Sequence, residues 1–327
     1  MYQTGSTADV FSLLTLLQNF LVTTAGYTVN RSNSTSNNTR LQVSKSGRYF
    51  NFAIPFAQDV SGSFTGQYTS LLMNAGTGYS SGSDWYNQPG TMVSLASNYF
   101  ISAMIDIGVV SSYHFFYKTS SDYDCVYVFV ESNGIWQRLL FGKMATNNYN
   151  TWSGLDGMFY QGSKAPLDHN PSLALSLFGA SVPDWVSEAP QGAVFGNVEL
   201  NQNWMSGNWS IPNASFSPRF QVFDSISKQS YIWLNAENAS SGAPCALPIQ
   251  ILATRGSTAD AGVNTEFSFV GSLPDIFWAN ITNLVPGSTI KIGQKSYVVF
   301  PFTKKSDTWK NDVPANGTYN FGLIVKK

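Results

Sequence analysis

The chain has 327 residues, of which 43% are hydrophobic, 15% are aromatic and only 11% are charged, and its formal net charge is −1. Charged residues make up roughly 25% of an average soluble domain, so Ser, Thr, Asn and Gly must supply most of the polar surface, as is typical of β-rich proteins. Without a basic surface or a long run of one charge sign, the chain is not expected to bind nucleic acid or an anionic membrane.

A short helix is predicted near the start of the chain. Apolar residues from Val10 to Leu21 recur at helical spacing and form one stripe. Ser6 and Asp9 have the spacing of a capping box, and Gly26 stands where a left-handed residue would end the helix. The tract from Asn30 to Arg40 is nearly all Ser, Asn and Thr, so we expect a hairpin tip or an exposed loop there.

A long ordered loop is predicted at residues 61–98, which are rich in Gly, Ser and Asn. Strands are expected before it at 41–43 and 49–55, on either side of a Ser46-Gly47 turn. A loop of this length needs anchoring against its conformational entropy, and aromatic rings are suited to provide it. Three aromatic residues form a possible contact surface, with packing into the core as the alternative: Tyr79, Trp85 and Tyr86.

The strongest strand signals lie in the middle of the chain. Strands are expected at 113–117, 123–131 and 135–141, and the last two are separated by an Asn133-Gly134 turn, which is typical of a tight hairpin. Residues 123–131 are apolar at both odd and even positions. We therefore expect this strand to be covered on both faces.

Three units are predicted along the chain, and one continuous unit is the alternative. They are an N-terminal unit at 1–145, an irregular aromatic-rich connecting region at 146–215 with a short helix near 171–178, and a C-terminal β unit at 216–327. Together they predict a mainly β fold of sandwich-like antiparallel sheets, with a short N-terminal helix and long ordered loops. Strands of the last unit are expected at 216–234, 249–254, 266–270, 277–281, 289–292, 297–302 and 319–325.

The sequence contains no recognised catalytic or cofactor motif, so we expect no enzymatic activity, no cofactor and no metal. The chain has two histidines, and both His114 and His169 are expected in core or turn positions. The two cysteines, Cys125 and Cys245, are expected to be buried free thiols. No apolar stretch is long enough to span a bilayer and no secretory signal is recognisable, which favours synthesis and assembly in a cytoplasm.

Two other classes of function stay open. A glycosidase needs only two carboxylates, and a sugar-binding surface needs exposed aromatic rings, although packing is the expected role of the tryptophans. The available carboxylates are Asp106, Asp122, Asp124, Glu131 and Asp156, and the available rings are Trp85, Trp136, Trp152, Trp204 and Trp209.

Four blocks of sequence carry a resemblance to a known family. They are residues 2–6 with the helix exit at 25–29, the glycine-rich piece 76–79 with Trp85 to Gly90, the hairpin 123–131 with 139–143, and the closing segments 290–293, 299–301 and 322–326. Over most of the chain these blocks resemble a group of structural proteins of tailed-bacteriophage virions, components of the tail or baseplate. The chain departs from that pattern after Lys143, where only Trp152-Ser153-Gly154 echoes the family's tryptophan and glycine motif.

The resemblance implies a non-enzymatic virion protein with an empty list of catalytic residues. Its partners would be copies of itself and other virion proteins, and it would be assembled in the host cytoplasm into the tail or baseplate. A receptor-binding or carbohydrate-binding tail module and a head or collar decoration protein are the alternatives. A tail-associated hydrolase is a further rival.

Overall fold

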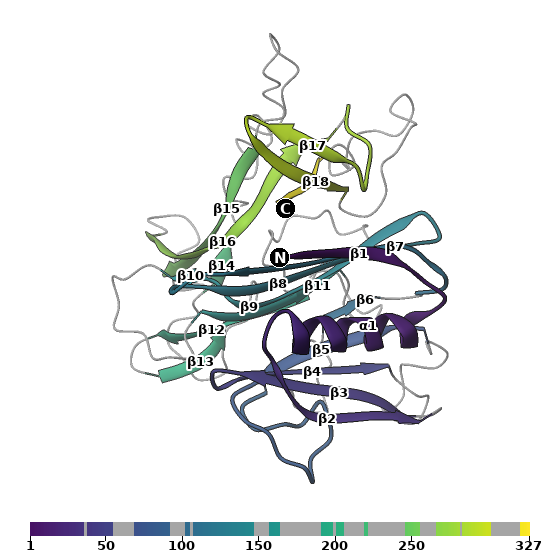
Figure 1. Ribbon diagram of the computed structural model, residues 1–327. Helices are drawn as coiled ribbons and strands as arrows, with labels where there is room; N and C mark the ends of the chain where they lie inside the picture. Colours follow the sequence, from purple (N-terminus) through teal and green to yellow (C-terminus); the bar gives the residue numbers. More distant parts are fainter. Residues whose placement is uncertain are drawn as a thin grey trace, which may run out of the picture.

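The computed structural model describes residues 1–35, 38–54, 69–91, 102–104, 107–146, 157–163, 191–198, 201–205, 219–221, 246–255, 266–281, 283–301 and 321–327. These residues form three antiparallel sheets and the helix α1 (Val10–Thr23) (Figure 1). The mainly β fold class, with sandwich-like antiparallel sheets and a short N-terminal helix, is therefore confirmed.

We name the sheets by their place along the chain. The N-terminal sheet has the order β2 (Thr28–Thr35), β3 (Asn38–Lys45), β4 (Arg48–Ile54), β5 (Leu71–Gly76) and β6 (Ser102–Met104). The central sheet has the order β1 (Tyr2–Thr7), β7 (Val110–Thr119), β8 (Asp124–Ser132), β9 (Ile135–Lys143), β11 (Met158–Gly162), β12 (Gln191–Val198) and β13 (Asn201–Met205). The C-terminal sheet has the order β14 (Arg219–Gln221), β15 (Ala246–Arg255), β16 (Glu266–Asn280), β19 (Phe321–Lys326), β18 (Lys295–Pro301) and β17 (Thr289–Ile292), and β10 (Ala145–Thr146) pairs with β16.

The central sheet is the middle layer of the molecule. Val126, Val128 and Val130 of β8 share one core cluster with α1 and the N-terminal sheet. Tyr127 and Phe129, at the alternate positions, share a second cluster with the C-terminal sheet. The prediction that this strand is covered on both faces is confirmed (Figure 1).

The predicted helix is confirmed, but its cap differs from the expected one. The backbone N–H of Ser12 donates to the Asp9 carboxylate at 2.7 Å, so Asp9 itself is the N-cap. The capping box was wrong because Ser6 lies in β1, which is extended and pairs with β7. Gly26 does adopt the left-handed conformation, with φ +72°.

Two predicted loops contain strands. Residues 71–76 form β5 inside the predicted loop at 61–98, because Leu71, Met73 and Ala75 point into the core while the strand pairs with β4. In the polar tract 30–40, β2 and β3 pair up to Thr35 and Asn38, so the expected hairpin exists but its strands run through most of the tract. Residues 36–37, 55–68 and 92–98 lie outside the described residues.

The predicted irregular region at 146–215 is also wrong in part. It supplies β11, β12 and β13, which extend the central sheet beyond β9. These strands are short and are separated by long stretches rich in Gly, Asn and Pro, so the sequence shows no alternation of apolar and polar residues long enough to predict them. The helix predicted near 171–178 lies outside the described residues.

The hairpin predictions are confirmed. Ser46-Gly47 has φ angles of 51° and 77°, and Asn133-Gly134 has 55° and 73°, which are the left-handed values that tight two-residue hairpin turns require. In the C-terminal unit, the strands expected at 266–270 and 277–281 belong to the single long strand β16, and the other expected strands from 249 onward coincide with β15, β17, β18 and β19. Of the strand signal at 216–234, only β14 lies within the described residues.

Candidate functional site

The predicted contact residues lie in the segment 77–91, which we call the glycine-rich loop. Its centre is the buried side chain of Gln88. The Gln88 Nε2 group donates to the carbonyl oxygens of Ser80, Ser83 and Asp84 at 3.1, 2.9 and 3.0 Å, and its Oε1 accepts from the Ser80 N–H at 2.8 Å. One amide thus contacts four backbone groups, with its two N–H hydrogens shared among three carbonyl oxygens, and this bonding fixes the shape of the loop.

Glycines allow the two ends of the loop to approach closely. The Pro89 carbonyl accepts from the N–H groups of Thr77 at 2.9 Å and Gly78 at 3.2 Å. A Cβ atom on Gly76 would lie 2.7 Å from that carbonyl oxygen, and one on Gly90 would overlap the Thr77 side chain. The glycines and Pro89 of this block are therefore part of what folds the loop.

The three aromatic residues of the loop do not form one surface. Trp85 is only 1% exposed and lies 5.9 Å from the Arg40 guanidinium, so it anchors the loop against the N-terminal sheet. This corrects the prediction that Trp85 belongs to a contact surface, and core packing holds for that residue. Tyr79 and Tyr86 are half-buried. The outward side of the loop consists of small or polar residues: Ser81, Gly82, Asp84, Asn87, Pro89 and Gly90.

A row of amide side chains connects the loop to the N-terminal sheet. Gln42, Asn51 and Asn74 are direct neighbours on β3, β4 and β5. Gln42 donates to Asn51 at 3.1 Å, Asn51 donates to Asn74 at 2.9 Å, and Asn74 reaches the Tyr86 carbonyl of the loop at 3.5 Å. The signal in the sequence is an amide residue between two apolar residues on three successive strands.

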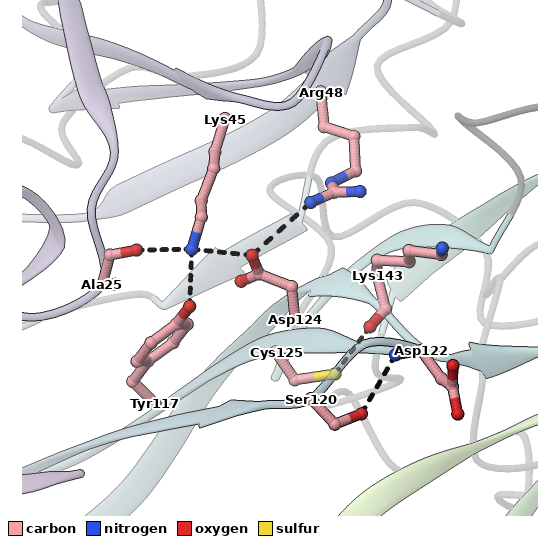
Figure 2. Close-up of polar contacts among 9 residues, drawn as sticks. All are labelled: Ala25, Lys45, Arg48, Tyr117, Ser120, Asp122, Asp124, Cys125 and Lys143. Atoms are coloured by element: carbon pink, nitrogen blue, oxygen red, sulfur yellow. Dashed lines mark hydrogen bonds and ion pairs between the residues drawn. The ribbon is translucent and has the colours of Figure 1, made fainter.

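A second polar cluster, the charged junction, joins the N-terminal sheet to the central sheet (Figure 2). Lys45 Nζ donates to the Asp124 carboxylate at 2.8 Å, to the Tyr117 hydroxyl at 2.5 Å and to the Ala25 carbonyl at 2.6 Å. Arg48 lies 3.5 Å from the same carboxylate oxygen. Burial alone would lower the pKa of Lys45, but its bonds to Asp124 and Tyr117 raise that pKa above its ordinary value.

Three of the residues with catalytic potential are held in structural contacts. Asp124 is bound by the two cations of the charged junction. Cys125 is a buried free thiol that donates to the Lys143 carbonyl at 3.0 Å, and burial raises its pKa well above the ordinary range. His114 is buried, as expected, and burial with the nearby Lys327 charge lowers its pKa to about 4.

The other candidates are dispersed. Trp136 is buried, Asp122 is exposed and Glu131 is half-buried. Within the described ranges no three His, Cys, Asp or Glu side chains could hold a metal ion, and no described helix is long and apolar enough to span a bilayer. Trp204 lies in β13, and the remaining candidates lie outside the described residues: Asp106, Asp156, His169, Cys245, Trp152 and Trp209.

Comparison with known protein families finds no matching family model, and comparison with curated proteins finds no significant match.

Proposed function

We propose that the protein is a non-enzymatic structural component of a tailed-phage virion, present in several copies in the tail or baseplate. The observation that carries the proposal is the construction of the glycine-rich loop. The residues that resemble virion proteins, above all Gln88, Pro89 and Gly90, are the residues that fix its shape. A contact element that is already ordered loses little entropy when it binds a neighbour.

The outward side of the loop suits contacts between virion subunits. Apart from Asp84, its exposed residues are uncharged, so burying them against a partner leaves few charges to be paired. The partners would be copies of this chain, arranged symmetrically or quasi-symmetrically, and other tail or baseplate proteins.

The contacts of three side chains with catalytic potential also support a non-enzymatic role. His114, Asp124 and Cys125 occupy positions in which their reactive atoms already bind neighbouring side chains or backbone groups. A carbohydrate-binding role would need exposed aromatic rings, whereas Trp85 and Trp136 are buried. Of the candidate rings whose side chains the structure describes, only Tyr79 and Tyr86 are left to support the glycan-binding alternative.

The location of the protein in the virion tests the proposal. Virions of the phage that encodes the chain would be treated with antibodies against the purified protein and imaged by electron microscopy. Label at the tail tube or baseplate is the expected result. Label on the head, on the collar or at fibre tips, or absence from the particle, would reject the tail and baseplate assignment.

A loop variant tests the contact surface separately. Gly82 is exposed and a Cβ atom there would meet no neighbour within 4 Å, so Gly82→Arg should fold and yet obstruct a partner. The matched control is Ser121→Arg, at an exposed turn of the central sheet. We expect fewer complete tails with Gly82→Arg alone, and equal yields for the two variants would contradict a role for the loop.

A further inference from the structure

His114 lies at the contact between the central sheet and the C-terminal sheet. Its side chain comes from β7, and the residue is only 5% exposed. The Tyr2 hydroxyl lies 2.7 Å from Nδ1 and the Ser112 hydroxyl lies 2.9 Å from Nε2. Both ring nitrogens are thus satisfied by neutral groups.

The surroundings of the ring are aromatic on one side and cationic on another. The centroids of Phe300 from β18 and Trp136 from β9 lie 5.1 and 5.7 Å from the imidazole centroid. Tyr2 from β1 stacks on the imidazole at 5.9 Å, and the Lys327 ammonium stands 4.9 Å from the Tyr2 ring centroid. Burial raises the pKa of Tyr2, so Lys327 is the charge that faces His114 in acid.

A carboxylate at the contact between these two sheets already has cationic partners. Asp275 of β16 lies 3.7 Å from Lys118 and 3.4 Å from Lys326. None of the described contacts of the His114 ring is with a carboxylate. A proton on the imidazole would therefore place a charge at a buried position without a counter-ion among its described contacts.

We propose that His114 makes the contact between the central and C-terminal sheets sensitive to acid, so that its protonation separates the C-terminal sheet from the rest of the molecule. The other face of the central sheet packs against α1 and the N-terminal sheet mainly through apolar side chains, and Asp124 at that contact is paired with Lys45 and Arg48. That contact should persist when the first one opens. The inference does not depend on the proposed virion function.

The direction of the pH dependence follows from the lowered pKa. The neutral imidazole is the form that the folded state prefers, since the pKa of His114 falls from 6.5 to about 4. Its contribution to the contact is complete above pH 6.5 and declines as the pH falls toward 4. The fall of the His114 pKa from 6.5 to about 4 corresponds to a roughly 300-fold change in the equilibrium between the packed and the separated C-terminal sheet.

Hydrogen exchange followed by mass spectrometry tests the proposal on the full chain. At pH 7, 5.5 and 4, after correction for intrinsic exchange rates, peptides covering β18 and β19 should lose up to roughly 300-fold of their protection, while those covering α1 and β4 keep theirs. His114→Gln retains hydrogen-bonding groups for Tyr2 and Ser112 but cannot take up the proton, so β18 and β19 should stay protected at pH 4. Equal loss in this variant and in the natural chain would overturn the proposal.

Two further measurements separate His114 from other causes. Asp275→Asn removes the carboxylate described at this contact, and it should leave the pH dependence in place. If the pH dependence disappears in Asp275→Asn, the Asp275 carboxylate and not His114 causes it, and the proposal is overturned. NMR titration of the His114 ring in the natural chain needs no variant, and a value near 6.5 would overturn the proposal, whereas a value near 4 supports it.

Discussion

Gln88 illustrates how single polar side chains hold this protein together. Its amide is enclosed by the glycine-rich loop and binds backbone groups at four points. Asp124 has a similar role between two sheets, where it binds Lys45 and Arg48. In both places a buried polar group is stable only because its partners are present, so removing it leaves several other groups unsatisfied.

Gln88→Ala should destabilise the protein by roughly 1–3 kcal/mol, because it leaves partly buried backbone groups of the loop without their side-chain partner. Urea denaturation of the variant and the natural chain measures the difference in unfolding free energy. The neighbouring Asn87 is exposed, so Asn87→Ala is the control and should change stability by less than about 0.5 kcal/mol. Similar values for the two variants would contradict the role given to Gln88.

Asp124→Asn should lower the unfolding free energy by about 2 kcal/mol, less than for a fully buried pair, since the Asp124 side chain is 11% exposed and the Lys45 side chain 21%. The control is Asp122→Asn, two residues earlier and exposed. A double-mutant cycle with Lys45→Met isolates the pair. An interaction energy near zero would show that the junction does not stabilise the packing of the two sheets.

At the scale of elements, the sequence predicts those helices and turns that depend on neighbouring residues alone. The β3–β4 and β8–β9 hairpins follow from Ser46-Gly47 and Asn133-Gly134, which adopt positive φ angles, and α1 follows from its apolar stripe. β5 was missed because its core residues lie in a segment whose composition is that of a loop. Trp85 was assigned to a surface because composition does not tell whether a loop aromatic points inward, and that depends on the sheet beneath it.

Gly142 offers a test of close strand packing in the central sheet. It has φ +132° in β9, and a Cβ atom there would overlap the Asp124 carbonyl of β8. Gly142→Ala should therefore destabilise the protein by roughly 2 kcal/mol or more, since both the backbone angle and the neighbouring strand oppose the side chain. Thermal unfolding compares it with Gly82→Ala, where there is open space, and equal melting temperatures would show that the strands can separate without cost.

At the scale of the whole molecule, one sheet serves two cores. The central sheet contributes Val126, Val128 and Val130 to one core and Tyr127 and Phe129 to the other. Phe300 is the main contribution of β18 to the second core, and its ring stacks on Phe129 with centroids 3.9 Å apart. The two cores share a backbone but almost no side chains, which is why one contact can open while the other holds.

Phe300→Ala should cost about 3–5 kcal/mol, because it leaves a cavity beside Phe129, Phe116 and Trp136. The loss should be confined to the C-terminal sheet in hydrogen exchange at neutral pH. Ile290→Ala, at a half-buried position on the edge strand β17, is the control and should have a much smaller effect. Equal loss of protection in α1 would show that the two cores are not independent.

The pairing of β1 with β7 also constrains the order of folding. Tyr2 lies opposite Phe116, and Ala145 of β10 lies opposite Ser272 of β16. Both pairings close long loops, and topologies dominated by such non-local contacts fold slowly. During synthesis the β2–β3–β4 meander, whose partners are adjacent in sequence, can form before either loop closes. The C-terminal sheet joins last, and until then the aromatic face of the central sheet is open to association with other chains.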